Sequence, residues 1–277
     1  MIDESFKGVG GVQIYAGSWH PEGTQPRAIV VIAHGFNSHS GFYAWVTEQF
    51  VHSGFSVYAL DHRGRGKSEG ERYFVNSVTE YVDDLGTLIQ QAKAKQPGIP
   101  LYLLGHSAGG VISCTYALDH QTELSGLICE SFAFQVYAPD FALSVLKGVS
   151  HIAPHLHVLK LPIPDFSRDP KVIEALWNDP QVSQEVQPTQ TVAELARANE
   201  RLKAAFSSLL LPVLIIHGTA DKVTRPEGSQ LFFDHAGSVD KTLKLYEGYA
   251  HDPLNDVGKE VVIADIVGWI NERLQKS

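Results

Sequence analysis

The stretch Leu101-Tyr102-Leu103-Leu104-Gly105-His106-Ser107-Ala108-Gly109-Gly110 decides the fold prediction, because an apolar run leads directly into a serine flanked by glycines. This is G-x-S-x-G between a predicted strand and a predicted helix, the context that a nucleophile elbow requires. A sharp turn lifts the serine hydroxyl above the sheet, and close packing of strand against helix leaves room only for glycine on either side. We therefore predict Ser107 as a nucleophile at the carboxyl end of a strand.

Outward from this stretch, short apolar runs alternate with longer helical segments, a pattern typical of a mostly parallel sheet covered by helices on both faces. The predicted strands are residues 28–33, 56–60, 101–104, 126–129, 213–216 and 242–246, and the predicted helices are residues 43–53, 77–95, 108–120, 227–235 and 258–274. Several of these strands are almost entirely apolar, as expected where both faces of a sheet are buried. The sequence thus predicts an α/β fold.

The alternation stops between residues 131 and 200. This stretch holds seven of the 14 prolines and contains no convincing strand. We predict that it is a lid, inserted into a discontinuous core formed by residues 1–130 and 201–277. A segment of this length with so many prolines is too short to fold alone.

The aromatic residues of this insertion are predicted to line an acyl or aryl pocket. We predict substrate contacts at Phe132, Phe134 and Tyr137, and also at Phe42 and at His106 next to the nucleophile. The apolar lid is also a candidate for transient contact with a membrane or lipid surface.

A serine hydroxyl needs a base that is held by an acid, in the chain order serine, acid, histidine for this architecture. Asp221 and His251 each lie in the loop directly beyond a predicted strand, and they complete that order. Glu130 is the rival acid, because it also directly follows a strand. We predict Asp221 as the acid and His251 as the base, and leave open whether Glu130 assists or replaces Asp221.

The negative charge that forms on the attacked carbonyl needs two preorganised N–H donors. One comes from the residue after the nucleophile and the other from the loop after an earlier strand. Ala108 follows Ser107, and the strand 28–33 leads directly into His34-Gly35-Phe36. The backbone N–H groups of Ala108 and Phe36 are therefore the predicted oxyanion hole.

Charge and composition exclude several classes of function. With 22 Lys and Arg against 31 Asp and Glu the formal net charge is −9, and the chain has no basic run, so no nucleic-acid partner is expected. The two cysteines, Cys114 and Cys129, cannot form a disulfide framework. No signal peptide is visible, and every apolar run is far shorter than the roughly 18 residues of a membrane span. A cytoplasmic protein is expected.

Two weaker motifs resemble a metal site and a cofactor site. The histidines of residues 151–157 lack a partnering carboxylate cluster, so no metal site is expected there. Gly66-Lys67-Ser68 resembles the end of a phosphate-binding loop, but Asp61 stands where that loop needs its first glycine. The prediction is therefore a protein without cofactor, and the oligomeric state stays open.

Five stretches together resemble the monoacylglycerol lipase and lysophospholipase branch of the α/β-hydrolases. They are HGFNSHSGFY (34–43), LDHRGRGKSEG (60–70), GHSAGG (105–110), HGTADKVT (217–224) and YEGYAHDPLND (246–256). The segment SRDPKVIEALWNDP (167–180) also resembles the lid of that group. The resemblance spans almost the whole chain and implies an α/β-hydrolase fold with an inserted lid and a serine hydrolase mechanism. It implies the same triad and the same oxyanion donors that the residues indicate.

The chain departs from the family pattern near the site. Members of the family often carry Met at the position of Ala108, and Glu and Arg around the loop that holds Ser38 and Phe42 here. Loss of both charges favours a more apolar alcohol or an aromatic group in the substrate. The expected function is monoacylglycerol lipase-like cleavage of monoesters through an acyl-enzyme. The alternatives are a carboxylesterase for short-chain or aromatic esters and a catalytically silent hydrolase fold that acts as a binding protein.

Overall fold

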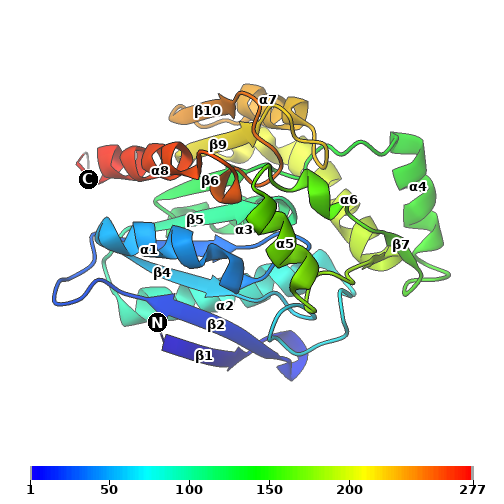
Figure 1. Cartoon of the computed structure of the whole chain (residues 1–277), viewed down its shortest axis with the longest axis horizontal. Coiled ribbons are helices and arrows are strands. Elements are labelled where there is room, and N and C mark those ends of the chain that lie inside the picture. The colour runs from blue at the N-terminus through cyan, green and yellow to red at the C-terminus, as the bar shows by residue number, and fades with distance from the viewer. Residues whose placement is uncertain (1, 276–277) are drawn as a thin grey trace.

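The computed structural model describes residues 2–275, and it consists of a central sheet with helices on both faces (Figure 1). The strands of the sheet are β1 (Ile2–Lys7), β2 (Gln13–Trp19), β3 (Ala28–Ala33), β4 (Phe55–Leu60), β5 (Leu101–His106), β6 (Gly126–Glu130), β9 (Val213–Gly218) and β10 (Lys241–Tyr246). Within the described range they follow the order β1-β2-β4-β3-β5-β6-β9-β10. All neighbours from β4 to β10 are parallel, whereas β2 pairs antiparallel with both β1 and β4. The predicted mostly parallel sheet is confirmed.

The sequence prediction omits the antiparallel strands β1 and β2. Strand β1 reads IDESFK, and Phe6 is its buried residue. An edge strand can carry charged side chains, so it lacks the continuous apolar run that identifies a strand buried on both faces. The predicted strands of the sheet centre are all present, and β5 and β6 extend to His106 and Glu130.

The core helices divide between the two faces of the sheet. They are α1 (Ala44–His52), α2 (Val78–Lys95), α3 (Ala108–His120), α7 (Pro226–His235) and α8 (Lys259–Leu274). Val31 of β3 packs in one cluster with α2, α3 and α7, whereas Val30 packs in another with α1 and α8. Side chains of a strand alternate between its faces, so both faces are buried. The carboxyl ends of the parallel strands meet at one edge, where the loops are free to carry a site.

The segment between β6 and β9 leaves the sheet. It forms α4 (Asp140–Val149), β7 (His157–Leu159), α5 (Pro170–Asn178), β8 (Gln187–Pro188) and α6 (Thr189–Ala205). Helix α4 and β7 stand out at the right of Figure 1, while α6 returns to the core. The predicted boundary at residue 200 falls inside α6, whose Ala198 and Leu202 lie in the same cluster as α2 and α3. The second half of α6 is therefore part of the core.

Short 3₁₀ helices connect these elements. They are η1 (Val9–Gly11), η2 (Ser40–Tyr43), η3 (Gln121–Glu123), η4 (Ile163–Asp165), η5 (Phe206–Ser208) and η6 (Pro253–Asn255). Among residues 2–275, no helix has both the length and the apolar character needed to cross a membrane.

Buried polar contacts fasten residues 179–187 of the insertion to the core. Arg65, in the loop after β4, pairs with Glu185, and each side chain is only 1% exposed. Arg65 Nη2 also donates to Gln187 Oε1 at 2.7 Å. Asn37, in the loop after β3, donates from Nδ2 to the Val182 carbonyl oxygen at 3.1 Å. A buried charge is tolerated when it is paired, so these contacts fix this part of the insertion against the core.

The buried ion pair predicts a measurable loss of stability. Glu185→Gln removes the negative charge and leaves the Arg65 guanidinium buried without a counter-charge. We expect the free energy of unfolding to fall by about 3–5 kcal/mol, measured by urea denaturation. The control is Asp119→Asn, which breaks an ion pair with Arg201 in which both side chains are about half exposed. This control should cost about 0–1 kcal/mol, and an equally small effect of both substitutions would contradict the structural role of the buried pair.

Candidate active site

Ser107 occupies the turn from β5 into α3 with φ 53° and ψ −118°. A non-glycine residue rarely adopts positive φ, because its Cβ then crowds the backbone. The flanking glycines permit the close packing around it. A Cβ at Gly105 would lie 2.5 Å from the Gly109 carbonyl oxygen, and a Cβ at Gly109 would collide with the Ala33 carbonyl oxygen. The turn therefore has the strained backbone and the close contacts that the motif predicts.

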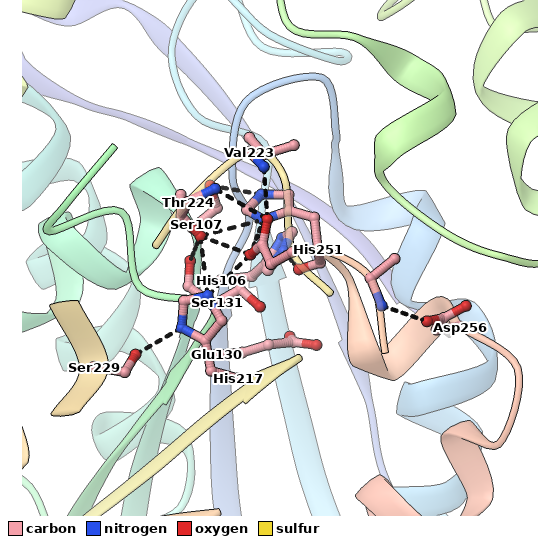
Figure 2. A network of polar contacts seen from close by, with 12 residues as sticks. His106, Ser107, Glu130, Ser131, His217, Val223, Thr224, Ser229, His251 and Asp256 are labelled. Carbon is pink, nitrogen blue, oxygen red and sulfur yellow. Dashed lines mark hydrogen bonds and ion pairs between the residues drawn. The ribbon is translucent and has the colours of Figure 1, made fainter. Parts of the chain in front are cut away.

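The side chains of Ser107, His251 and Asp221 form one line of hydrogen bonds, part of which Figure 2 shows. His251 Nε2 lies 3.0 Å from Ser107 Oγ, and His251 Nδ1 lies 2.8 Å from Asp221 Oδ2. An ionised carboxylate only accepts, so Nδ1 carries the hydrogen and Nε2 is left to accept the Ser107 hydroxyl proton. Asp221 follows β9 and His251 follows β10, and all three residues are buried. The structure thus brings the three predicted residues together.

Asp221 accepts hydrogen bonds from several other groups. The backbone N–H groups of Val223 and Thr224 donate to Oδ1 at 2.7 and 3.0 Å. Thr224 Oγ1 lies 2.7 Å and His217 Nε2 3.0 Å from Oδ2. Burial alone would raise the pKa of Asp221, but the hydrogen bonds and the electrostatic interactions with His251 and His217 lower it well below its usual value. The carboxylate is therefore ionised when it contacts His251.

Sequence reasoning missed Thr224 and His217 as partners of the acid. The spacing D-x-x-T at residues 221–224 could have identified Thr224, because an aspartate side chain often accepts from backbone N–H groups two and three residues further on. For His217, which lies near the end of β9 and four residues before the acid, no local pattern indicates the contact. Its Nδ1 is held 2.7 Å from Ser229 Oγ of α7, a contact that only the tertiary structure creates.

Glu130, the rival acid, has other partners. Its Oε1 accepts from the Leu254 N–H at 2.8 Å, and Asp221 is the carboxylate that hydrogen-bonds the His251 ring. Burial and the neighbouring Asp252 raise the pKa of Glu130 well above its usual value.

Among the described residues, one group of side chains has the spacing needed to hold a metal ion. It consists of His106, Glu130 and Asp252, and one ligand-type atom of each lies within 4.8 Å of the others.

The two predicted oxyanion donors lie at the same cavity as the serine. Phe36, Ser107 and Ala108 all line it. Ala108 begins α3, and the first N–H groups of a helix have no partner within the helix and lie at the positive end of its dipole. The Phe36 ring is covered by Arg65, whose Cζ lies 4.2 Å from the ring centroid. The contact between Arg65 and Glu185 therefore also supports the loop that carries Phe36.

A cavity of about 670 Å³ adjoins Ser107, with walls from the loop after β6, from α4, from β7 and from α6. Its apolar lining includes Phe134, Val136, Tyr137, Leu143, Leu146, Leu159, Leu161, Val192 and Leu195. The predicted contacts Phe134 and Tyr137 thus belong to the wall. A cavity of this volume with apolar walls can take a small organic ligand.

Three predicted substrate contacts lie outside the cavity wall and are corrected. Phe132 is fully buried in the core, with its ring 5.4 Å from that of Phe232. Phe42 packs against His39, with the ring centroids 4.7 Å apart. His106 is buried, and its Nε2 lies 3.2 Å from the His251 carbonyl oxygen. An aromatic residue near a site can pack into either core or pocket, and residue type alone does not distinguish the two.

Comparison with known proteins agrees with this architecture. Residues 24–258 match the family described as serine aminopeptidase, S33. The monoacylglycerol lipase of Mycolicibacterium smegmatis is 35% identical over 274 residues, which cover 98% of each chain. The monoglyceride lipase of Homo sapiens is 30% identical over 269 residues, covering 95% of this chain and 88% of the human one.

A solved structure is similar as well. The crystal structure of Paleococcus ferrophilus monoacylglycerol lipase superposes with a TM-score of 0.84 at 29% identity, covering 95% of this chain and 99% of the other. The family match and these relatives span nearly the whole chain, including the sheet and the loops after its strands. The chain therefore belongs to the serine aminopeptidase, S33 family, is an ester hydrolase with the α/β-hydrolase fold, and has monoacylglycerol lipases as full-length relatives.

Proposed function

We propose that this chain hydrolyses monoacylglycerols and related monoesters through an acyl-enzyme formed on Ser107. The observation that carries the proposal is the unbroken line of hydrogen bonds from Asp221 through His251 to Ser107. That line ends at the wall of an apolar cavity. A nucleophile, its base and an orienting acid beside a ligand-sized cavity are the parts that acyl transfer requires.

In the proposed mechanism, Ser107 Oγ attacks the ester carbonyl carbon while His251 Nε2 accepts the hydroxyl proton. Asp221 holds the Nδ1–H group and stabilises the imidazolium that forms. The N–H groups of Phe36 and Ala108 donate to the carbonyl oxygen as it becomes negative. His251 then gives its proton to the leaving alcohol, and a water molecule activated by His251 hydrolyses the acyl ester and releases Ser107.

Monoacylglycerols are the proposed substrate class for two reasons. The cavity wall is largely apolar side chains from α4, β7 and α6, which suit an acyl chain. The full-length relatives include monoacylglycerol lipases, one of them 35% identical. A small-molecule ester is accordingly the proposed partner of the site.

A carboxylesterase for short-chain or aromatic esters is the second candidate. It is favoured by Ser38 and Phe42, which stand where related enzymes often carry charged residues. Ser38 is buried and Phe42 packs on the His39 ring. Neither residue lines the cavity and neither carries a charge, so this loop offers no charged group that would bind the hydroxyl groups of glycerol.

The insertion of residues 131–200 is proposed as a lid that touches lipid surfaces. Several of its large apolar side chains are exposed, most strongly Phe141 of α4 at 76% and Ile152 at 88%. Val145 and Leu156 are more than half exposed. Phe141 and Val145 are four residues apart on α4 and therefore lie on the same face of that helix, and an exposed apolar face often marks a contact with another surface.

The triad assignment predicts a contrast between two carboxylates. Asp221→Asn should lower kcat by about 10⁴-fold, because an amide cannot hold the required tautomer or stabilise the imidazolium. Glu130→Gln should lose far less, because Glu130 does not contact the His251 ring. Steady-state hydrolysis of p-nitrophenyl butyrate measures both. A larger loss for Glu130→Gln would make Glu130 the acid and overturn this assignment. Wild-type protein that neither turns over p-nitrophenyl esters nor reacts with a fluorophosphonate would be the silent binding protein instead.

The cavity predicts a dependence on acyl chain length. Leu195→Trp adds volume to a residue that lines the cavity from α6, so turnover of long-chain monoacylglycerols should fall more than turnover of acetyl or butyryl esters. Arg201→Trp, at an exposed position of the same helix, is the control and should leave the chain-length profile unchanged. Equal turnover of monoacylglycerols and the matching methyl esters by the wild type would favour the carboxylesterase over the monoglyceride assignment.

The lid proposal predicts weaker binding to lipid. Phe141→Asp should reduce co-sedimentation with phosphatidylcholine vesicles, because it replaces an apolar contact with a charge. Val239→Asp is the matched control, because Val239 is fully exposed but lies in the turn before β10, outside the insertion. An equal loss for both variants, or no binding by the wild type, would contradict lipid contact through α4.

A further inference from the structure

Three buried polar side chains lie close to one another and next to His251. They are His106 at the end of β5, Glu130 at the end of β6 and Asp252, which follows His251. Their exposed fractions are 1%, 0% and 8%. One nitrogen or oxygen atom of each lies within 4.8 Å of the other two. The mechanism proposed above uses none of the three.

The known partners of these side chains determine which atoms can donate. His106 Nε2 faces the His251 carbonyl oxygen at 3.2 Å, and a carbonyl only accepts, so Nε2 carries the hydrogen. Burial lowers the pKa of His106 to about 4, so the ring is neutral near pH 7 and its Nδ1 is an acceptor. Glu130 Oε1 accepts from the Leu254 N–H at 2.8 Å, and Asp252 Oδ2 accepts from Asn255 Nδ2 at 2.9 Å.

Each of the three side chains has one further polar atom that is left without a hydrogen bond. Among the described residues, His106 Nδ1, Glu130 Oε2 and Asp252 Oδ1 are buried and have no hydrogen-bond partner. Two adjacent carboxylates in a buried site repel each other strongly, and a proton shared between them removes one charge and supplies the missing donor. Burial and the Asp252 carboxylate, in that order, raise the pKa of Glu130 well above its usual value.

We propose that Glu130 and Asp252 share one proton and act with His106 as positioning residues for His251. Two hydrogen bonds hold the chain at and after His251. His106 donates to the His251 carbonyl oxygen, and Glu130 accepts from the N–H of Leu254 in η6, three residues further on. Asp252 holds Asn255 at the end of the same short helix. The positioning role rests on the proposed function, in which His251 is the base, whereas the shared proton does not.

Other titratable groups face the pair from each neighbouring element. Tyr43 of η2 interacts electrostatically with both carboxyl groups, and Tyr246 of β10 interacts in the same way with Glu130. Burial, as the largest cause, raises the pKa of both phenols, so both are neutral across the physiological range. His106 from β5 is neutral, and the His251 ring lies 4.9 Å from the His106 ring. Glu130 and Asp252 are therefore the groups of this cluster that compete for one proton.

The shared proton predicts a specific pH dependence of stability. In the folded chain Glu130 keeps a proton that the unfolded chain releases near the ordinary carboxyl pKa. The folding equilibrium of the wild type should therefore weaken as pH rises from that value to the raised value, by up to about tenfold per pH unit for one proton. In Glu130→Gln the amide donates to Asp252 at every pH, so the pH dependence caused by the Glu130 proton is absent. The variant should therefore gain stability relative to wild type as pH rises.

Urea unfolding of wild type and Glu130→Gln from about pH 5 to 9 measures this difference. Glu247→Gln is the control, because Glu247 is exposed in the loop after β10, and it should follow the wild type at every pH. A constant difference between Glu130→Gln and wild type over the whole range would overturn the shared proton. One equivalent of metal in purified wild-type protein that is lost in Glu130→Gln, measured by elemental analysis, would also overturn it and assign the cluster to a cation.

Kinetics test the positioning role. Glu130→Leu removes the acceptor for the Leu254 N–H and the shared proton, and it leaves Asp252 ionised beside His251. We expect kcat per fluorophosphonate-reactive site to fall by about 10- to 100-fold with KM nearly unchanged. The acidic limb of kcat/KM should stay in place, because the pair carries one negative charge in wild type and in the variant alike. Glu130→Gln, which keeps a polar group at this position, should restore most of kcat.

The outcomes separate this inference from the proposed function. Wild-type protein that does not react with a fluorophosphonate would defeat the ester hydrolase mechanism on Ser107, while the unfolding series would still decide whether the proton is shared. Reactive wild-type protein, together with a Glu130→Leu variant whose kcat per reactive site equals that of wild type, would contradict the positioning role alone.

Discussion

The left-handed backbone at Ser107 is the constraint on which the rest of the site depends. Positive φ at a serine costs of the order of 1–3 kcal/mol, and the surrounding packing must hold it. Helix α3 lies so close to β3 that only glycine fits at position 109, and the Ser107 N–H is bound by the Glu130 carbonyl oxygen at 2.9 Å. The turn aims Oγ at His251, which the parallel order of β5, β6, β9 and β10 brings to the same edge of the sheet.

Two buried carboxyl groups near this turn have opposite electrostatic environments. Asp221 receives hydrogen bonds from backbone and side-chain donors and from two histidines, which keep it ionised. Glu130 receives one from the Leu254 N–H and lies against Asp252, which favours its protonated form. Environments that separate pKa values in this way commonly divide the roles of similar residues. The division explains why strand position alone left both residues as candidates for the acid, whereas the hydrogen bonds favour Asp221.

Local patterns predicted the centre of the fold and the three residues aligned at Ser107, but not their surroundings. Continuous apolar strands and a serine between glycines reflect short-range geometry, so they are visible in sequence. Strand β1 is polar because it lies at an edge, and α6 crosses the predicted boundary because Leu202 packs in the core. Phe132 and Phe134 are two residues apart, yet one is in the core and the other also lines the cavity. Such differences depend on tertiary packing, as does the contact of His217 with Asp221.

The central claim is that Ser107 becomes acylated during turnover, and peptide mapping of the acid-quenched enzyme tests it most directly. After brief mixing with excess p-nitrophenyl butyrate, mass spectrometry should find a butyryl group on the peptide that contains Ser107. The modified fraction should rise within the burst of p-nitrophenol release and decay as substrate is exhausted. Ester turnover with the acyl group on another residue, or with no covalent adduct at any quench time and no burst, would contradict the account.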